Sequence, residues 1–395
     1  MTRRVTLAAG AVGVALLAGC SVVDEVGATG TTTPAPPPPA PEATLQFSVT
    51  DMSAPIRPDA DLSVAATGGE MVTVRLIGPD NEVVPGRIVD GRWQLDEATR
   101  LVPDSTYTWR ASARNPDGVV TTTSHELRTL TPEIEATYRV TPDGHTVGVG
   151  MPVMVTFDSA VMTSEMRADV ERRMTIKTTP EQSGSWGWLD DRQLMWRPDE
   201  YWKPGTKISV NAPLTGVQTG ENKWIGEHKG GDFTIADRAR VSTVDIGNHV
   251  MTVRENGSVV ATYPVSSGKA TPEWETRSGT KVITEMHAEY TMDAGTLGVD
   301  EDDDDYYLTD VEYAMRVTNT GEFLHAAPWS TWAQGRRNVS HGCVNMSTAA
   351  AREMFNRTLI GDVVEFVNSG RQMKAGDGLS VWIFTPQEWA ERSAL

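Results

Sequence analysis

Cys343 is the residue of this chain whose setting most strongly indicates chemistry. It lies in the stretch NVSHGCVNMS, residues 338–347, and is one of only two cysteines among 395 residues. A nucleophilic thiol needs a base within hydrogen-bond reach, a group that orients the base, and donors for the oxyanion. The residues around Cys343 therefore have to supply these three partners.

Two histidines are candidates for the base. His341 lies only two residues before Cys343, so on a strand or loop it would flank the thiol rather than face it. His325 ends an expected strand over residues 317–325, and the loop that follows is long enough to fold back onto the thiol. We therefore expect His325 to be the base. No acid lies near it in sequence, so a backbone carbonyl such as that of Ala326 is the expected acceptor for its other ring nitrogen.

The residues beside the thiol could stabilise charge. Gly342 leaves the approach path of an acyl group free and allows a sharp turn, so the N–H groups of Gly342 and Cys343 are the expected oxyanion donors. A helix expected over residues 347–359 would place Cys343 at its mouth, where the helix dipole favours a thiolate.

Two other interpretations of Cys343 are open from composition alone. A lone cysteine is commonly a small buried hydrophobe. A zinc site is the second alternative, but His325, His341 and Cys343 supply only three ligands. No metal and no cofactor is expected.

The other cysteine, Cys20, ends a segment that has the features of an export signal. Residues 1–20 contain two arginines, an apolar run over residues 5–17, too short for a membrane span, and the sequence Leu-Ala-Gly-Cys. This end resembles a bacterial lipobox, which implies lipidation of Cys20 and a place on the outer face of the cell membrane. A plain secretory signal with an incidental cysteine is the alternative. The sequence does not distinguish the general from the twin-arginine export route. Cys343 would then have no disulfide partner.

Composition separates the rest of the chain into several parts. Residues 21–42 are rich in proline, which favours an extended tether that would hold the folded part away from the membrane. The formal net charge of −18 makes nucleic acid an unfavourable partner. We expect a mainly β chain with two β-sandwiches, residues 43–130 and 131–237, a mixed β domain over residues 238–369, and a short C-terminal subdomain, residues 370–395.

The expected β-strands are indicated by alternating apolar and polar residues and by turn sequences between them. Val72, Val74 and Leu76, and later Tyr107, Trp109, Ala111 and Ala113, alternate with polar residues. Val153, Val155 and Phe157 repeat the pattern in the second sandwich, where residues 163–174 predict one helix capped by Thr163. Asn256-Gly257 predicts a type I′ hairpin at the start of the third unit. Trp382 and Trp389 predict that the C-terminal tail packs on this third unit.

The spacing of His325 and Cys343 resembles a known family. Seventeen residues separate the two, and Cys343 lies within Ser340-His341-Gly342-Cys343-Val344-Asn345. This pattern resembles the signature of the L,D-transpeptidases, the YkuD-type catalytic domain, and the whole mature chain resembles the actinobacterial members with two immunoglobulin-like domains. The resemblance implies that Cys343 attacks a tetrapeptide stem of peptidoglycan, expels D-alanine and passes the acyl group to a second stem as a 3→3 cross-link. It also implies acylation by carbapenem-type β-lactams.

Further positions match the family's substrate pocket. The resemblance implies that the following residues contact substrate or shape the pocket: Met292, Tyr307, Thr320, Gly321, Trp329, Ser340, His341 and Asn345. For the aromatic and methionine residues among them, ordinary core packing is the alternative. The hairpin before Tyr307 departs from the family, because it carries six consecutive acids, residues 300–305. We expect these acids to form a solvated loop. The alternative is that they attract a basic group, such as the amine of the acceptor, or a cation.

Two rival functions are consistent with the sequence. An L,D-carboxypeptidase would form the same thioester and resolve it with water. An envelope lipoprotein without activity would use its sandwiches to bind glycan or another protein. A papain-like peptidase is disfavoured, because there the cysteine precedes the histidine in the chain.

Overall fold

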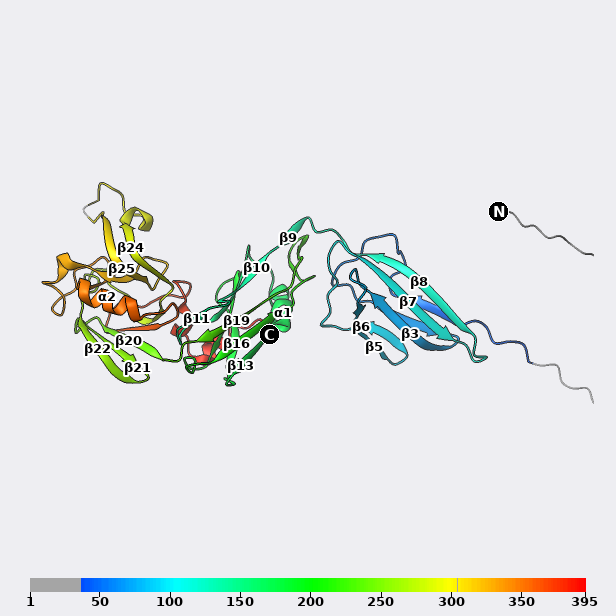
Figure 1. The fold of residues 1–395 in the computed structure, drawn as a ribbon. Coiled ribbons are helices and arrows are strands. Elements are labelled where there is room, and N and C mark those ends of the chain that lie inside the picture. Colours follow the sequence, from blue (N-terminus) through cyan, green and yellow to red (C-terminus); the bar gives the residue numbers. More distant parts are fainter. Residues whose placement is uncertain (1–36, 304) are drawn as a thin grey trace, which may run out of the picture. The chain divides into compact units, whose positions relative to one another are not determined.

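The chain folds mainly into β-strands (Figure 1). The computed structural model describes residues 37–303 and 305–395. The expected signal segment, Cys20 and most of the expected tether lie outside the described residues. Within the described part, the helices are too short or too polar for a membrane span.

The first sandwich pairs two four-stranded sheets, with strand orders β1-β2-β6-β5 and β4-β3-β7-β8. Tyr107, Trp109, Ala111 and Ala113 are all buried, as their alternation predicts. Val72, Val74 and Leu76 of β3 are more buried than the Thr73 and Arg75 between them, so this alternation is also present. A bulge between Met71 and Thr73 shifts the register at its start. The strands are β1 (Thr44–Phe47), β2 (Ser63–Thr67), β3 (Glu70–Ile77), β4 (Val83–Val84), β5 (Gly86–Val89), β6 (Arg92–Leu95), β7 (Thr106–Arg114) and β8 (Val120–Arg128).

The second sandwich contains the sheets β10-β12-β15-β14 and β11-β19-β16-β13 and a small sheet, β17-β18-β9. The predicted helix is present as α1 (Ser164–Arg173), and Thr163 accepts a hydrogen bond from the Met166 N–H. The strands are β9 (Ile134–Ala136), β10 (Tyr138–Thr141), β11 (Thr146–Val147), β12 (Val153–Phe157), β13 (Thr175–Thr179), β14 (Gly184–Trp188), β15 (Gln193–Pro198), β16 (Lys207–Ala212), β17 (Gln218–Gly220), β18 (Lys223–Ile225) and β19 (Lys229–Ile235).

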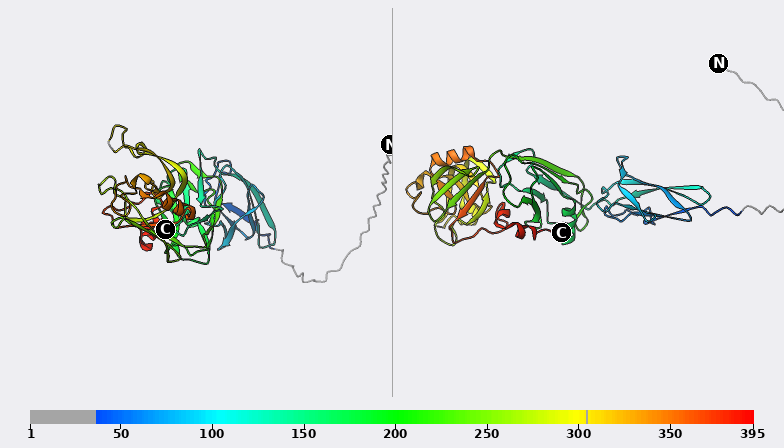
Figure 2. Two further views of the ribbon diagram at one scale, coloured as in Figure 1. Left: turned by 60° about the vertical axis from the view of Figure 1, so that its left-hand side comes forward. Right: turned by 90° about the horizontal axis from the view of Figure 1, so that it is seen from below.

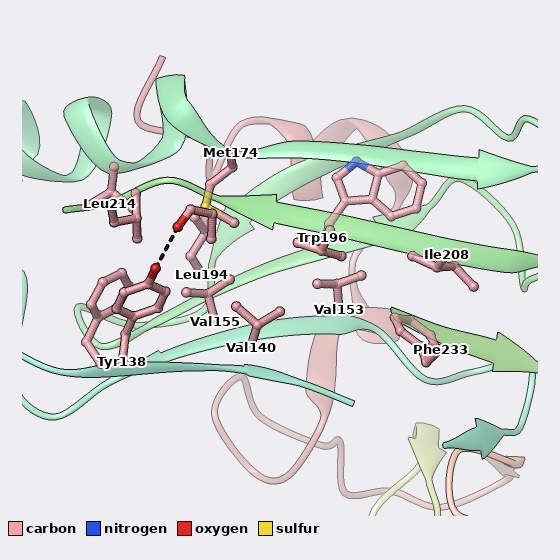
Figure 3. Close-up of a cluster of buried hydrophobic side chains, with 14 of the residues drawn as sticks. Tyr138, Val140, Val153, Val155, Met174, Leu194, Trp196, Ile208, Leu214 and Phe233 are labelled. Atoms are coloured by element: carbon pink, nitrogen blue, oxygen red, sulfur yellow. Dashed lines mark hydrogen bonds between the residues drawn. The ribbon is translucent and has the colours of Figure 1, made fainter. Parts of the chain in front are cut away.

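The core of this second sandwich lies between its two larger sheets (Figure 3). Val153 and Val155 of β12 are fully buried there, beside Trp196. The buried Tyr138 hydroxyl donates to the Ala212 carbonyl at 2.6 Å, so its polar atom is satisfied inside an apolar core. The predicted inward face of β12 is therefore confirmed.

The third unit contains the sheets β22-β21-β20-β28-β23 and β24-β25-β26-β27. Parallel pairs, β20 with β28 and β26 with β27, occur beside antiparallel ones, so the predicted mixed β class is confirmed. The strands are β20 (Arg240–Asp245), β21 (Val250–Glu255), β22 (Ser258–Pro264), β23 (Gly279–Val282), β24 (Glu285–Asp293), β25 (Leu308–Arg316), β26 (Phe323–Ala326), β27 (Val344–Met346) and β28 (Val363–Val367). The helical elements are α2 (Thr348–Arg357), η1 (Ala294–Leu297) and η2 (Pro328–Ser330).

Local signals explain two elements of this unit. Asn256 and Gly257 both have positive φ, 49° and 83°, as a type I′ turn between β21 and β22 requires. Ser347 caps α2 by accepting a hydrogen bond from the Ala350 N–H. The helix packs on β25 and β26 (Figure 2) and covers the sheet that contains His325.

The C-terminal tail contains η3 (Ser380–Ile383) and α3 (Pro386–Ala390). The tail contacts the third unit, as predicted, through η3 against β23 and through Asp377. Its two tryptophans, however, pack against the second sandwich, so the prediction is wrong for these side chains. Trp389 is fully buried, beside Leu189 and Met195, and its indole N–H donates to the Ser185 carbonyl at 3.2 Å. The Trp382 indole N–H donates to the Gly150 carbonyl at 2.7 Å. Apolar patterning predicts burial of a side chain but not its partner.

Candidate active site

Cys343 lies in a tight turn just before β27. The Ser340 hydroxyl donates to the Cys343 carbonyl at 2.6 Å and accepts from the Gly342 N–H at 3.2 Å. Gly342 has φ +123°, which side chains rarely tolerate, so glycine is needed at this position. These contacts fix the backbone that carries the thiol.

The Cys343 thiol is nearly enclosed, with the residue only 6% exposed. Its Sγ donates to the Gly321 carbonyl at 3.5 Å. Burial raises the pKa of the Cys343 thiol to about 12, although the Phe323 backbone opposes the shift. The expectation of a thiolate stabilised at a helix mouth is wrong, because β27 separates Cys343 from α2. The Cys343 side chain is therefore a neutral thiol, which would need a base to act as a nucleophile.

His325 lies on β26, which pairs in parallel with β27. The expected strand over residues 317–325 is shorter than predicted, because Gly321 has φ +88° and residues before Phe323 form a turn. His325 Nδ1 lies 2.8 Å from the Ala326 carbonyl oxygen. A carbonyl can only accept, so Nδ1 carries the proton and Nε2 keeps its lone pair. Burial lowers the pKa of His325 to about 4, which keeps the ring neutral.

A cavity of about 360 Å³ joins His325 to Cys343. The structure brings together in its wall eight of the side chains that the sequence singled out, namely Met292, Tyr307, His325, Trp329, Ser340, His341, Cys343 and Asn345. Sequence analysis did not identify Thr309, Val311, Ser330, Trp332 and Val339, which complete the wall. The sequence did contain a signal for Trp332, because it stands three residues after Trp329 in the same loop. In the structure both tryptophans are more than half exposed.

Three predicted positions lie outside this cavity. Thr320 and Gly342 line a neighbouring cavity of about 550 Å³, and Gly321 lines a smaller one of about 220 Å³. Gly321 nevertheless contacts the thiol through its carbonyl. The Gly342 N–H, an expected oxyanion donor, is bound to Ser340 in this structure.

Polar side chains hold the cavity wall in place. The Asn345 amide donates to the Ser330 hydroxyl at 3.0 Å, and Ser330 donates to the Ala327 carbonyl at 3.0 Å. Tyr307 stacks on His341 with ring centroids 4.9 Å apart. Burial raises the pKa of Tyr307, so its hydroxyl stays protonated and can donate.

A buried charged pair lies beside the turn that contains Cys343. Lys281 is fully buried and donates to Glu322, which is 3% exposed. The Arg277 N–H donates to the other Glu322 oxygen at 3.0 Å. The side chain of Glu322 lies beside Gly342, since a Cβ built there would be 3.6 Å from Glu322 Cγ. Sequence reasoning missed this pair, because its members are 41 residues apart.

Comparison with protein families gives two matches that together span most of the described chain. Residues 53–218 match the bacterial Ig domain, and residues 239–366 match the L,D-transpeptidase catalytic domain. The second match includes both His325 and Cys343.

Individual relatives match over nearly the full length. The chain is 34% identical over 366 residues to L,D-transpeptidase 2 of Mycobacterium tuberculosis (strain CDC 1551 / Oshkosh), which covers 92% of this chain and 87% of the relative. It is 33% identical over 363 residues to L,D-transpeptidase 5 of strain ATCC 25618 / H37Rv, with 90% and 78% covered. A solved structure of the LD transpeptidase LdtMt1 in complex with imipenem matches 60% of this chain and 100% of its own, with 34% identity and a TM-score of 0.51.

Proposed function

The chain belongs to the peptidoglycan L,D-transpeptidases, and we propose that it forms 3→3 cross-links between stem peptides through a thioester on Cys343. The observation that carries the roles of the two residues is their shared cavity. A neutral His325 with a free Nε2 lone pair lines the same wall as a buried, protonated Cys343 thiol. Base and nucleophile thus start in the protonation states that the reaction requires.

In the first half-reaction, His325 Nε2 takes the thiol proton while Cys343 Sγ attacks the carbonyl between the third and fourth residues of a donor stem. Collapse of the tetrahedral intermediate breaks the C–N bond, and the imidazolium returns the proton to the departing amine of D-alanine. Burial raises the thiol pKa and lowers the imidazole pKa, so a resting ion pair is unfavourable. Proton transfer is therefore coupled to attack rather than preceding it.

In the second half-reaction, the side-chain amine of a diaminopimelate on a second stem attacks the thioester. His325 Nε2 accepts a proton from this amine and delivers it to the Cys343 sulfur as the C–S bond breaks. The products are the cross-linked pair of stems and the original neutral thiol and imidazole.

The oxyanion is held by the N–H groups of Gly342 and Cys343, with the Tyr307 hydroxyl as a further donor. The Gly342 N–H now donates to Ser340 over a long 3.2 Å contact, which a stronger acceptor such as an oxyanion can replace. Met292, Trp329, His341 and Asn345 shape the acyl pocket. Thr320 and Gly321 border the approach to it from the neighbouring cavities.

Carbapenems are the expected covalent inhibitors. The Cys343 sulfur would open the β-lactam ring and form a thioester that has no small leaving group to expel. The imipenem complex of LdtMt1, to which 60% of this chain is similar, supports this expectation. Lipidation of Cys20 would anchor the enzyme on the outer face of the membrane, a proposal that labelling with a fatty acid in wild-type and Cys20→Ala cells would test.

Mass spectrometry of residues 21–395 with a purified disaccharide-tetrapeptide tests the function, with Cys343→Ala as the matched control. We expect dimers linked 3→3 and loss of D-alanine with the wild type only. Shortened monomers alone would identify a carboxypeptidase instead. Absence of any product, together with no imipenem adduct, would favour a binding role for the sandwiches.

A further inference from the structure

The acidic run ends in a residue that is bound to the body of the third unit. Asp305 precedes β25, and its Oδ1 lies 2.5 Å from Lys269 Nζ. Its Oδ2 accepts from the Trp274 indole N–H at 2.8 Å, and His341 Nε2 lies 3.4 Å from Oδ1. Asp300 and Asp302, earlier in the same run, are exposed. Asp305 therefore differs from the solvated loop that the sequence predicts for the run.

Lys269 and Trp274, two partners of Asp305, belong to a segment that contacts the turn of residues 340–343, here called the Cys343 turn. The Lys269 N–H donates to the Ser340 carbonyl at 2.9 Å. The Thr276 hydroxyl, seven residues later, donates to the Gly342 carbonyl at 2.7 Å. Residues 268–276 thus contact the Cys343 turn through their backbone and side chains, and they contact the hairpin through Asp305.

His341 connects Asp305 to the cavity that contains Cys343, because it contacts Asp305 and also lines the cavity wall. The edge of Trp274 meets the His341 ring at a centroid distance of 4.8 Å, and Tyr307 stacks on the same ring at 4.9 Å. Asp305 faces the ring nitrogen, and Lys269 is the neighbouring cation. The His341 imidazole therefore contacts Trp274, Tyr307 and Asp305. Because Tyr307 stacks on this ring, the position of His341 affects that of Tyr307.

The hairpin of β24 and β25 covers the thiol through two side chains. Met292 of β24 and Tyr307 before β25 pack in one cluster with Cys343 and Phe323. The hairpin projects from its sheet (Figure 1), so its hold on the body depends on contacts such as those of Asp305. These contacts join the cover of the site to the turn that carries the nucleophile.

We propose that Asp305 is a positioning residue of the transpeptidase reaction, which holds the hairpin against the Cys343 turn and so places Tyr307 and His341 over the thiol. The proposal rests on the proposed function of Cys343. Asp305 does not touch the reacting atoms, and it acts through His341 and the hairpin. A carboxylate is required because its partners are a cation and an N–H donor.

Loss of this carboxylate has two opposite consequences. Asp305→Asn removes the ion pair with Lys269, so the hairpin leaves the turn more often and the thiol becomes more accessible to a small reagent. The same motion displaces Tyr307 and His341, so reactions that need the assembled pocket slow down. Loss of nucleophile reactivity alone would lower both rates. Global unfolding would also raise alkylation and lower acylation, so urea unfolding must show that Asp305→Asn is as stable as Asp302→Asn.

The experiment uses residues 21–395, in which Cys343 is the only thiol. The rate of alkylation by iodoacetamide and the rate of acylation at saturating imipenem are measured by mass spectrometry. For Asp305→Asn we expect alkylation to rise and acylation to fall, each about three- to fivefold, the range of an exposed ion pair. Asp302→Asn removes the same charge from the same run and should leave both rates unchanged. Asp305→Glu should retain most of the wild-type behaviour.

Lys269→Met breaks the same contact from the body side and should reproduce the Asp305→Asn result if that variant folds poorly. Equal rates for Asp305→Asn and Asp302→Asn, or a fall in both rates together, would overturn the proposal. Alkylation does not depend on the proposed reaction. A wild type that forms no imipenem adduct would count against the proposed function, while the alkylation rates would still decide whether Asp305 holds the hairpin.

Discussion

The Asp377 carboxylate accepts two hydrogen bonds from Thr320, one from its N–H at 3.0 Å and one from its hydroxyl at 2.8 Å. Asp377 belongs to the C-terminal tail, and Thr320 lies in the turn whose Gly321 carbonyl accepts from the Cys343 thiol. Arg277 donates to the same Thr320 hydroxyl at 2.8 Å. The tail therefore holds the turn that contacts the Cys343 thiol.

We expect Asp377→Ala to slow acylation of Cys343 and to lower the free energy of unfolding by about 1–3 kcal/mol, because it removes the acceptor of the Thr320 N–H and hydroxyl. Acylation by imipenem and urea unfolding measure the two effects. Thr320→Ala and the double variant complete a cycle. Strictly additive effects of the two changes would show that the contact carries no energy.

The buried pair of Lys281 and Glu322 gives a second prediction. Glu322→Gln removes the charge that compensates a fully buried ammonium, and loss of one partner of such a pair costs about 3–5 kcal/mol. Denaturant unfolding should show this loss for the single variant. Lys281→Met combined with Glu322→Leu replaces both charges with apolar groups and should recover much of the stability. A double variant as unstable as Glu322→Gln would contradict this account.

Gly342 gives a third prediction, about the backbone that carries the thiol. A Cβ at Gly342 meets no atom closer than 3.6 Å, so Gly342→Ala has space but is strained by φ +123°. We expect a loss of about 1–3 kcal/mol in unfolding free energy and slower acylation. Gly257→Ala, in an open turn with φ +83°, is the control and should cost less. Equal losses would mean that the Gly342 backbone carries no special strain.

Local sequence signals predicted the elements that depend on neighbouring residues. Asn256-Gly257 specifies its turn through positive φ, and Ser347 specifies the start of α2 through its side-chain cap. The expected strand over residues 317–325 is only partly present, because Gly321 turns the chain. β-propensity of the flanking residues does not reveal such a turn.

The parts of the site that sequence did not reveal depend on distant pairs. Lys281 and Glu322 are 41 residues apart, and Lys269 and Asp305 are 36 apart, so neither pairing has a periodic signal. Trp389 shows the same limit, since its burial was expected but its partner sheet was not. Sequence reasoning and family resemblance identified eight of the residues that line the cavity, but not the contacts that hold them.

The pH dependence of acylation gives the last prediction. Burial lowers the pKa of His325 from 6.5 to about 4, so its Nε2 lone pair is available throughout the range above about pH 4. We expect the acid limb of the imipenem acylation rate to lie near pH 4 rather than near pH 6.5. A midpoint near 6.5 would show that the imidazole is solvated in the reacting enzyme.

The free energy of unfolding should also depend on pH through His325. The unfolded chain binds a proton at His325 below pH 6.5, whereas the folded chain does so only below about pH 4, so stability falls as the pH decreases between these values. The full effect is on the order of 3 kcal/mol. Burial also lowers the pKa of His341, which is present in both proteins when wild type is compared with His325→Gln. Urea unfolding at pH 7 and pH 4.5 should therefore show a smaller acid-dependent loss in the variant, and an equal loss would place a charged, stabilised imidazole in the folded protein.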